Sequence, residues 1–128
     1  MRRMPDLHDD HILVRPFVAS DMAAVAAIFG MESAQAQAWL AYNIANEQTL
    51  ARLDQPPYGE RAIVRRSDDV VVGAIGLVPC VDVYGQVGIG ANDGHTHAEV
   101  GMFWHVIDAY RRHGYATAAA RLLLAYAC

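Results

Sequence analysis

Blocks of hydrophobic and polar residues divide the first half of the chain into a strand and two helices. The branched apolar run Ile12 to Phe17 is typical of a strand. Apolar residues at helical spacing follow between a capping Ser20 or Asp21 and Gly30, which predicts a first helix with a glycine stop. The segment Ser33 to Leu53 is rich in Ala, Gln, Glu and Leu and indicates a second helix.

The second half of the chain reads as three strands and a final helix. Arg61 to Arg66 and Val70 to Val78 flank three short polar residues, which predicts an antiparallel hairpin. The glycine-rich stretch Pro79 to His97 lacks periodicity and is interpreted as a long loop. Apolar residues then alternate over Ala98 to Val106, as in a strand, and Gly114 opens a helix that continues to Ala127. This order predicts an α+β fold, with helices packed over one sheet.

Length and composition favour one domain spanning residues 1–128. Hydrophobic residues make up 54% and charged residues 19%, which is too apolar for a disordered chain. No apolar run reaches the roughly 18 residues that a membrane span needs, and the start of the chain does not resemble an export signal. Cys80 and Cys128 are too few for a disulfide framework or a zinc site. We therefore expect a cytoplasmic protein that does not associate with membranes.

Charge argues against nucleic acid as a partner and leaves one local cluster of arginines. The formal net charge is -4, so the chain offers no overall basic surface for a phosphate backbone. Arg111 and Arg112, however, precede a glycine at the predicted start of the last helix. The start of a helix presents free N–H groups and partial positive charge, and arginine adds donors suited to phosphate. The pattern is consistent with a phosphate-binding turn or with a plain helix start whose arginines face water.

The surrounding sequence resembles a known family. Residues 98–106, followed by Tyr110 and then by Gly114 to Thr117, resemble motif A of the GNAT superfamily of N-acyltransferases, in particular its RimJ/RimL-like branch. Residues 13–16 resemble the first strand of that family, and residues 62–64 and 72–77 resemble its central hairpin. The resemblance extends from Ile12 to Cys128, and motif A is its specific part.

The resemblance implies an activity and a set of binding residues. The family binds acetyl-CoA and transfers the acetyl group to an amine, here a protein N-terminus or a small molecule, without a metal. By position, backbone groups that pair with the pantetheine arm would come from Trp104, His105 and Val106. The pyrophosphate would be held by Arg111, Arg112, His113, Gly114, Tyr115 and Ala116, and Thr117 would add a hydroxyl.

The resemblance also implies that the chain lacks part of the fold. Members of the family continue past the last helix with a strand, a helix and closing strands, so we expect a GNAT-like mixed sheet without its C-terminal strand-helix-strand part. The general acid often lies in that region and cannot be named here. Two alternatives to a working enzyme follow. In the first, the chain is a non-catalytic acyl-CoA-binding or interaction module. In the second, a partner subunit supplies the missing strand. Because the missing strand would leave the edge of the last strand unpaired, we also expect a homo-oligomer.

Single residues of the same region carry competing interpretations. Glu99 aligns with a family position at which a glutamate acts as the base, or it is a carboxylate at a strand start held by solvent or an arginine. The position of His105 favours a role in packing or in contact with the cofactor. His95 and His97 suggest a metal site or, more simply, a polar loop. Trp39 and Tyr42 either line the acceptor pocket or pack in the core.

Overall fold

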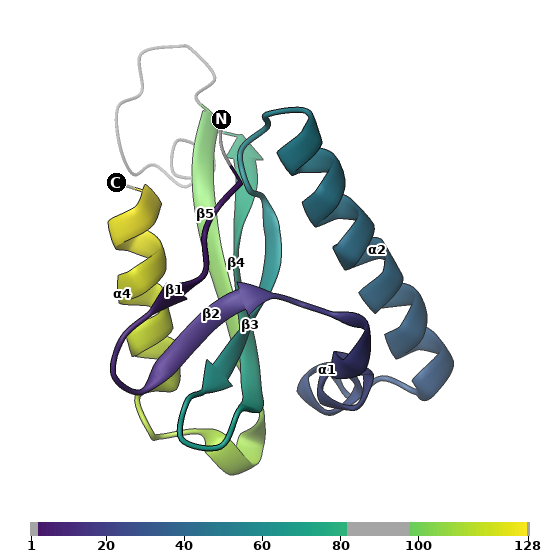
Figure 1. Cartoon of the computed structure of the whole chain (residues 1–128), viewed down its shortest axis with the longest axis vertical. Coiled ribbons are helices and arrows are strands. Elements are labelled where there is room, and N and C mark those ends of the chain that lie inside the picture. Colours follow the sequence, from purple (N-terminus) through teal and green to yellow (C-terminus); the bar gives the residue numbers. More distant parts are fainter. Residues whose placement is uncertain (1–2, 82–97, 128) are drawn as a thin grey trace.

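The described residues form one five-stranded sheet with helices on both faces (Figure 1). The computed structural model describes residues 3–81 and 98–127. Short 3-10 turns cover Ala19–Asp21 and Asp108–Tyr110. The strands and helices, in chain order, are β1 (Leu7–His8), β2 (Ile12–Pro16), α1 (Met22–Phe29), α2 (Ser33–Arg52), β3 (Gly59–Arg65), β4 (Val70–Val81), β5 (Ala98–Val106) and α4 (Tyr115–Ala127).

The strands follow one another across the sheet in the order β1-β2-β3-β4-β5, and each neighbouring pair is antiparallel. Within the described part of the chain, β5 is therefore an edge strand. Helix α4 covers one face of the sheet, and α1 and α2 cover the other (Figure 1). The start of α4 consequently lies beside the end of β5, where the predicted phosphate turn connects them.

The predicted α+β fold is confirmed, with three differences in detail. The two-residue strand β1 was not predicted; it pairs with β2 through a turn in which the Asp9 carboxylate accepts the N–H groups of His11 and Ile12, each at 2.8 Å. Strand β4 continues to Val81, so residues 79–81 belong to the sheet rather than to a loop, and residues 82–97 lie outside the described part. The five described strands are all antiparallel, so they do not show the mixed sheet that we expected.

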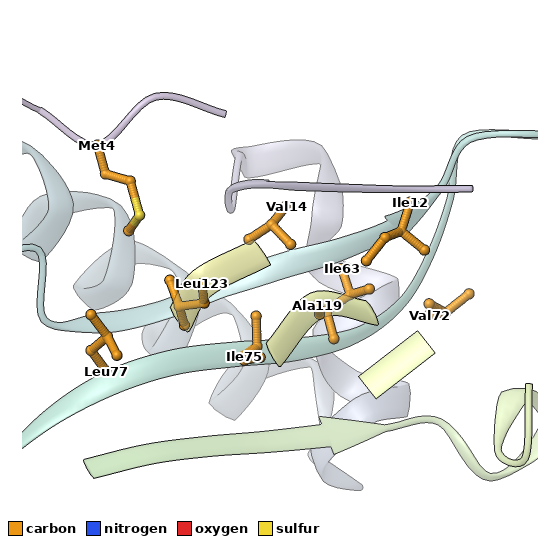
Figure 2. Close-up of a cluster of buried hydrophobic side chains, with 9 residues drawn as sticks. All are labelled: Met4, Ile12, Val14, Ile63, Val72, Ile75, Leu77, Ala119 and Leu123. Carbon is orange, nitrogen blue, oxygen red and sulfur yellow. The ribbon is translucent and has the colours of Figure 1, made fainter. Parts of the chain in front are cut away.

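The core beneath α4 joins that helix to three strands. Ala119 and Leu123 of α4 are fully buried, and Figure 2 shows them against branched side chains of the sheet. These two positions are four residues apart and therefore share one face of the helix. Full burial of a large aliphatic side chain such as Leu123 contributes roughly 1.5–3 kcal/mol. The strand residues and the N-terminal methionine of this cluster are Met4, Ile12, Val14, Ile63, Val72, Ile75 and Leu77.

A second core lies between the opposite face of the sheet and helices α1 and α2. Phe17, Phe29 and Trp39 form an aromatic chain, with ring centroids 5.3 Å apart for Phe17–Trp39 and 4.9 Å apart for Phe29–Trp39. Trp39 therefore packs against the core, which is one of the two roles that its sequence position allowed. Tyr42 is 69% exposed and is not part of this core.

A bulge in β4 lies next to the point where β5 approaches β4 closely. The register between β3 and β4 shifts between Ile63 and Val64, so that Val72 is the extra residue. Val72 consequently joins the core beneath α4, whereas Ala74 two residues later belongs to the other core. A side chain on the adjacent Gly73 would clash with the backbone carbonyl of His105. Glycine at this position therefore lets β5 approach closely at its functional end.

One buried ion pair ties α2 to the sheet. Arg61 of β3 is 2% exposed, and its Nη2 donates to Oε1 of Glu47 on α2 at 2.8 Å. Two other nitrogens of this guanidinium, Nε and Nη1, are buried without a hydrogen-bond partner in the described structure. Burial lowers the pKa of Arg61, and the charge of Glu47 opposes that effect. Glu47 is thus the carboxylate that hydrogen-bonds Arg61, and the charge of Asp6 adds to the compensation.

Candidate functional site

The candidate site begins where β5 ends. The Ile107 N–H donates to the Val72 carbonyl at 2.9 Å, which extends the pairing with β4 one step past the strand. A short 3-10 turn follows, closed by the Tyr110 N–H on the Ile107 carbonyl at 2.8 Å. The chain is therefore held on both sides as it leaves the sheet toward α4.

Two residues of the connecting turn have left-handed backbone conformations. Gly114 has a φ of 78°, which glycine adopts without the steric penalty of a side chain. Arg112 has a φ of 66°, an uncommon value for a residue with a Cβ. For a residue other than glycine this conformation costs of order 1–3 kcal/mol, and such residues cluster at ligand-binding sites. The backbone conformation of Arg112 in this turn therefore costs free energy in the folded state.

The start of α4 presents N–H groups toward solvent. The N–H of Ala118 donates to the Gly114 carbonyl at 3.0 Å, which is the first turn of hydrogen bonding in the helix. The N–H groups of Tyr115, Ala116 and Thr117 precede that bond and have no acceptor within the helix. Together with the helix dipole, they favour an anion at this position.

His113 is exposed, and its ring contacts the backbone of the turn. Its Nδ1 lies 3.0 Å from the Tyr110 carbonyl and 2.8 Å from the Arg111 carbonyl. Because both partners are acceptors, Nδ1 carries the hydrogen and donates to them. The ring also stacks on Tyr115, with centroids 5.6 Å apart and planes inclined by 10°. His113 therefore supports the turn through its side chain.

The two arginines of the turn differ in their present contacts. Arg111 donates from Nε to the Val106 carbonyl at 3.3 Å, and its Nη2 lies 3.1 Å from Oδ1 of Asp108. Both side chains of that ion pair are largely exposed, so the pair is worth at most about 1 kcal/mol and is easily exchanged for a phosphate. Arg112 is exposed beside it. The turn thus offers two positive charges at its surface.

The expected cofactor residues surround one pocket. The pocket has a volume of about 400 Å³ and takes in the end of β5, the turn and the first residues of α4. It includes all ten expected residues except His113, and adds Tyr110, which sequence reasoning did not assign to the site. Its lining residues are Trp104, His105, Val106, Tyr110, Arg111, Arg112, Gly114, Tyr115, Ala116 and Thr117.

Arg65 is a second residue that sequence reasoning missed. Its guanidinium lies over the Tyr110 ring, 4.9 Å from the centroid, and donates to both carboxylate oxygens of Asp68 at 2.9 and 2.7 Å. Hydrogen bonds to Asp68 and to Tyr115 raise the pKa of Arg65. A second pocket of about 730 Å³ lies beside the first, and Arg65 lines it with His113 and Gly114. No local sequence signal places Arg65 at the site, because Tyr110 and Tyr115, the site residues that it contacts, are distant in the chain.

The strand residues of the site point to both faces of the sheet. Trp104 lies two residues after Met102, which packs under α4, so these two residues share the α4 face. The His105 ring lies on the other face and stacks on Phe29 of α1, with 5.5 Å between centroids. The backbone of Glu99 pairs opposite Cys80 near the start of β5, and the Glu99 side chain lies outside the described structure. By strand alternation Glu99 and His105 share one face, six residues apart, or roughly 20 Å.

Metal binding finds no support in the part of the chain that is described. Residues 3–81 and 98–127 contain no group of three or more histidine, cysteine, aspartate or glutamate side chains that could hold an ion. His95 and His97 lie outside those ranges. Among the described helices, none has the length and apolar character needed to cross a membrane.

Comparison with known proteins assigns the family. Residues 11–128 match the family described as acetyltransferase (GNAT) domain, so the chain belongs to that family. A comparison with curated proteins gives no match. The assignment agrees with the resemblance carried by motif A, which corresponds to β5, the turn and the start of α4.

Solved structures agree on the fold. A GNAT-family acetyltransferase from Bacillus anthracis is 17% identical with a TM-score of 0.62, over 95% of this chain and 65% of its own. An acetyltransferase from Agrobacterium tumefaciens is 19% identical with a TM-score of 0.59, over 97% and 67%. A Vibrio cholerae protein described as a ribosomal-protein-serine acetyltransferase is 13% identical with a TM-score of 0.63, over 98% and 68%. The chain thus spans about two thirds of the length of these proteins, and at these identities the likeness concerns the fold alone.

Proposed function

We propose that this chain binds acetyl-CoA in the pocket between β5 and α4 and transfers the acetyl group to a primary amine. The observation that carries the proposal is the pocket itself, in which the exposed arginines, the left-handed turn and the free N–H groups of α4 converge. Membership of the GNAT acetyltransferase family supplies the chemistry.

Successive parts of the site match successive parts of acetyl-CoA. The pyrophosphate carries charge that the N–H groups of Tyr115 to Thr117 and the guanidinium groups of Arg111 and Arg112 can neutralise. The pantetheine arm is an extended chain with two amides, and the free edge of β5 at residues 104–106 offers backbone partners for them. The thioester then lies further back along β5, toward Glu99.

The reaction in this proposal is a direct attack of the amine on the thioester. The amine nitrogen forms a bond with the acetyl carbon, the carbon–sulfur bond breaks, and the coenzyme A thiolate leaves and takes up a proton. Holding both reactants in one site supplies much of the rate enhancement. A carboxylate that removes a proton from the amine adds typically 10²- to 10⁴-fold.

The acceptor proposed here is a protein N-terminus or a small amine, as in the RimJ/RimL-like branch. The Vibrio cholerae structure, described as a ribosomal-protein-serine acetyltransferase and 13% identical to this chain, points toward the same branch. The net charge of -4 favours a cationic acceptor. Release of coenzyme A thiol from acetyl-CoA, measured with a panel of amines and N-terminal peptides, tests the proposal. No release above the rate without amine would contradict it.

Glu99 is proposed as the base that acts while the carbon–nitrogen bond forms. We expect Glu99→Gln to lower kcat at neutral pH by about 10²-fold or more, because a general base contributes on that scale. The affinity for acetyl-CoA should change little, because the residue lies away from the phosphate turn. Steady-state kinetics and a binding titration of the same variant separate the two effects. Wild-type kcat would return Glu99 to a structural role at the start of the strand.

The chain is also proposed to associate with itself through β5. Val100 on β5 and Leu124 on α4 are 59% and 51% exposed, and both line an apolar pocket of about 600 Å³ next to the strand edge. Unpaired edge strands beside apolar surface favour pairing with another chain. The same edge would accept a strand from a different protein if the chain is a binding module.

Light scattering after size-exclusion chromatography tests this association. We expect a dimer or larger species for the wild type and a monomer for Val100→Lys, because a lysine on an edge strand opposes pairing. Leu53→Lys is the matched control: Leu53 is 61% exposed at the end of α2, away from the edge, and its replacement should leave the association intact. A wild-type monomer at all concentrations would contradict the proposal.

A further inference from the structure

A carboxylate with one unpaired, buried oxygen lies on the sheet face that α1 and α2 cover. Ala62 and Val64 lie two and four residues after Glu60 on β3, and their side chains belong to that core. Every second residue of a strand points to the same face, so Glu60 points to this face as well. Its Oε2 is buried and has no hydrogen-bond partner in the described structure. Buried carboxylate oxygens are normally satisfied by donors, so this oxygen is available to accept a hydrogen bond from a ligand.

Strand register places Glu60 across the sheet from the proposed site. Glu60 pairs with Gly76 of β4, and Gly76 pairs with Phe103 of β5, so the three residues form one row. Two strand spacings separate β3 from β5, or roughly 10 Å. Gly76 has no side chain, and Cζ of Phe103 lies 2.9 Å from the position of its absent Cβ. The Phe103 ring therefore reaches over Gly76 toward the carboxylate.

The row next to Glu60 contains a residue of the pocket. Ala62 pairs with Ala74, and Ala74 pairs with His105, which lines the pocket and shares a sheet face with Phe103. His105 also stacks on Phe29 of α1, so this residue connects the pocket between β5 and α4 to the α1/α2 face of the sheet. An amine that approaches β5 over this face meets the Phe103 ring and Glu60. Aromatic rings and carboxylates are the two groups that attract an ammonium ion.

We propose that Glu60 binds the ammonium group of the acceptor and takes its first proton. The inference rests on the proposed acetyl transfer and assigns the acceptor side of that site. The ammonium form gives one proton to the Glu60 carboxylate, which leaves a neutral amine with a free electron pair. After attack, the nitrogen loses its second proton as the carbon–sulfur bond breaks, through Glu99 in the proposed mechanism, and the thiolate becomes coenzyme A thiol. Glu60 then returns its proton to water.

The electrostatics of Glu60 suit a proton acceptor at neutral pH. Burial raises its pKa from 4.5 to about 7, and a base works best when its pKa lies near the operating pH. Few titratable groups face it. His105 and, by backbone alternation, Glu99 share its sheet face on β5, and Glu47 of α2 is engaged by Arg61 and Arg3. The β4 residues in its two rows, Gly76 and Ala74, do not titrate, and neither do Val25 and Ile28, the buried residues of α1.

Kinetics over pH 5.5–8.5 test the assignment. The wild-type kcat/KM for the amine should rise with a pKa near 7, because the free enzyme must hold Glu60 ionised to bind an ammonium ion. Glu60→Gln should lack this rise and lose about 10²-fold or more at pH 8, with an unchanged KM for acetyl-CoA. Glu99→Gln and His105→Gln serve as matched controls, in which the rise should persist. A Glu60→Gln variant that keeps the rise and the rate overturns the inference and leaves the acetyl transfer standing.

A second measurement does not depend on turnover. The folded pKa of Glu60 lies above the unfolded value, so its favourable contribution to stability is complete below pH 4.5 and is lost as pH rises to about 7. The melting temperature of the wild type should therefore fall relative to Glu60→Gln over that window. At pH 8, n-butylammonium chloride should raise the melting temperature of the wild type and not that of the variant. Equal responses of the two proteins overturn the inference, even if acetyl-CoA is not bound.

Discussion

Gly114→Glu should abolish the rise in melting temperature that acetyl-CoA gives to the wild type. A ligand at 100 times its Kd stabilises the folded state by about 2.7 kcal/mol, or about 10 °C for a domain of this size. The substitution places a negative side chain where the turn and the start of α4 favour an anion. It also puts a Cβ on a residue with a φ of 78°. Thermal unfolding with and without acetyl-CoA measures the effect.

The matched control for this variant is Gly30→Glu. Gly30 ends α1 with a φ of 64°, is exposed like Gly114, and has the same open space around its missing side chain. Both variants therefore carry the same charge and a similar backbone strain, but only one of them alters the pocket. We expect both to melt earlier than the wild type and only Gly30→Glu to keep the full shift with acetyl-CoA. If Gly114→Glu also keeps it, the ligand binds elsewhere.

Glu47→Gln should destabilise the chain by about 3–5 kcal/mol, because it leaves the buried guanidinium of Arg61 without its counter-charge. The hydrogen bond from Arg61 is 2.8 Å long, and two other nitrogens of the guanidinium already lack partners in the described structure. Glutamine keeps the shape of the side chain and removes its charge. Urea denaturation of the wild type and the variant gives the difference in the free energy of unfolding.

Arg3 supplies the control for this second prediction. Its Nε lies 3.2 Å from the same Glu47 oxygen, but its side chain is 58% exposed, so Arg3→Gln should cost less than about 1 kcal/mol. The double variant Arg61→Met, Glu47→Leu should recover much of the loss, since it removes both charges together. Equal costs for Glu47→Gln and Arg3→Gln would show that burial of Arg61 does not make it dependent on Glu47.

The sequence predicts the strands and helices well where a single period dominates. The glycine after α1 has the left-handed conformation expected of a helix stop, and its N–H donates to the Ala26 carbonyl. Strand β1 was missed because two residues carry no periodic signal, and it exists through pairing with β2. The bulge at Val72 was also missed, since a run of three valines shows no preferred face.

The sequence predicts the site residues that are contiguous in the chain, but not those that only the fold brings to the site. The pocket residues from Arg111 to Thr117 are contiguous, and their types alone suggest an anion site. Arg65 reaches that region from another strand, and nothing near it in the sequence signals the contact with Tyr110. Glu60 is similar: it looks like an ordinary polar residue of a strand, and only the sheet and the helices above it show that its carboxylate is buried.

The most direct test of the central claim is an amide NMR titration of the chain with acetyl-CoA. Bound pyrophosphate would accept hydrogen bonds from the first N–H groups of α4, and the pantetheine arm would pair with the end of β5. We therefore predict the largest chemical-shift changes at residues 104–106 and 111–117, with small changes in α1 and α2. Saturating acetyl-CoA that leaves these amides unchanged, or that shifts a different surface, would contradict the account.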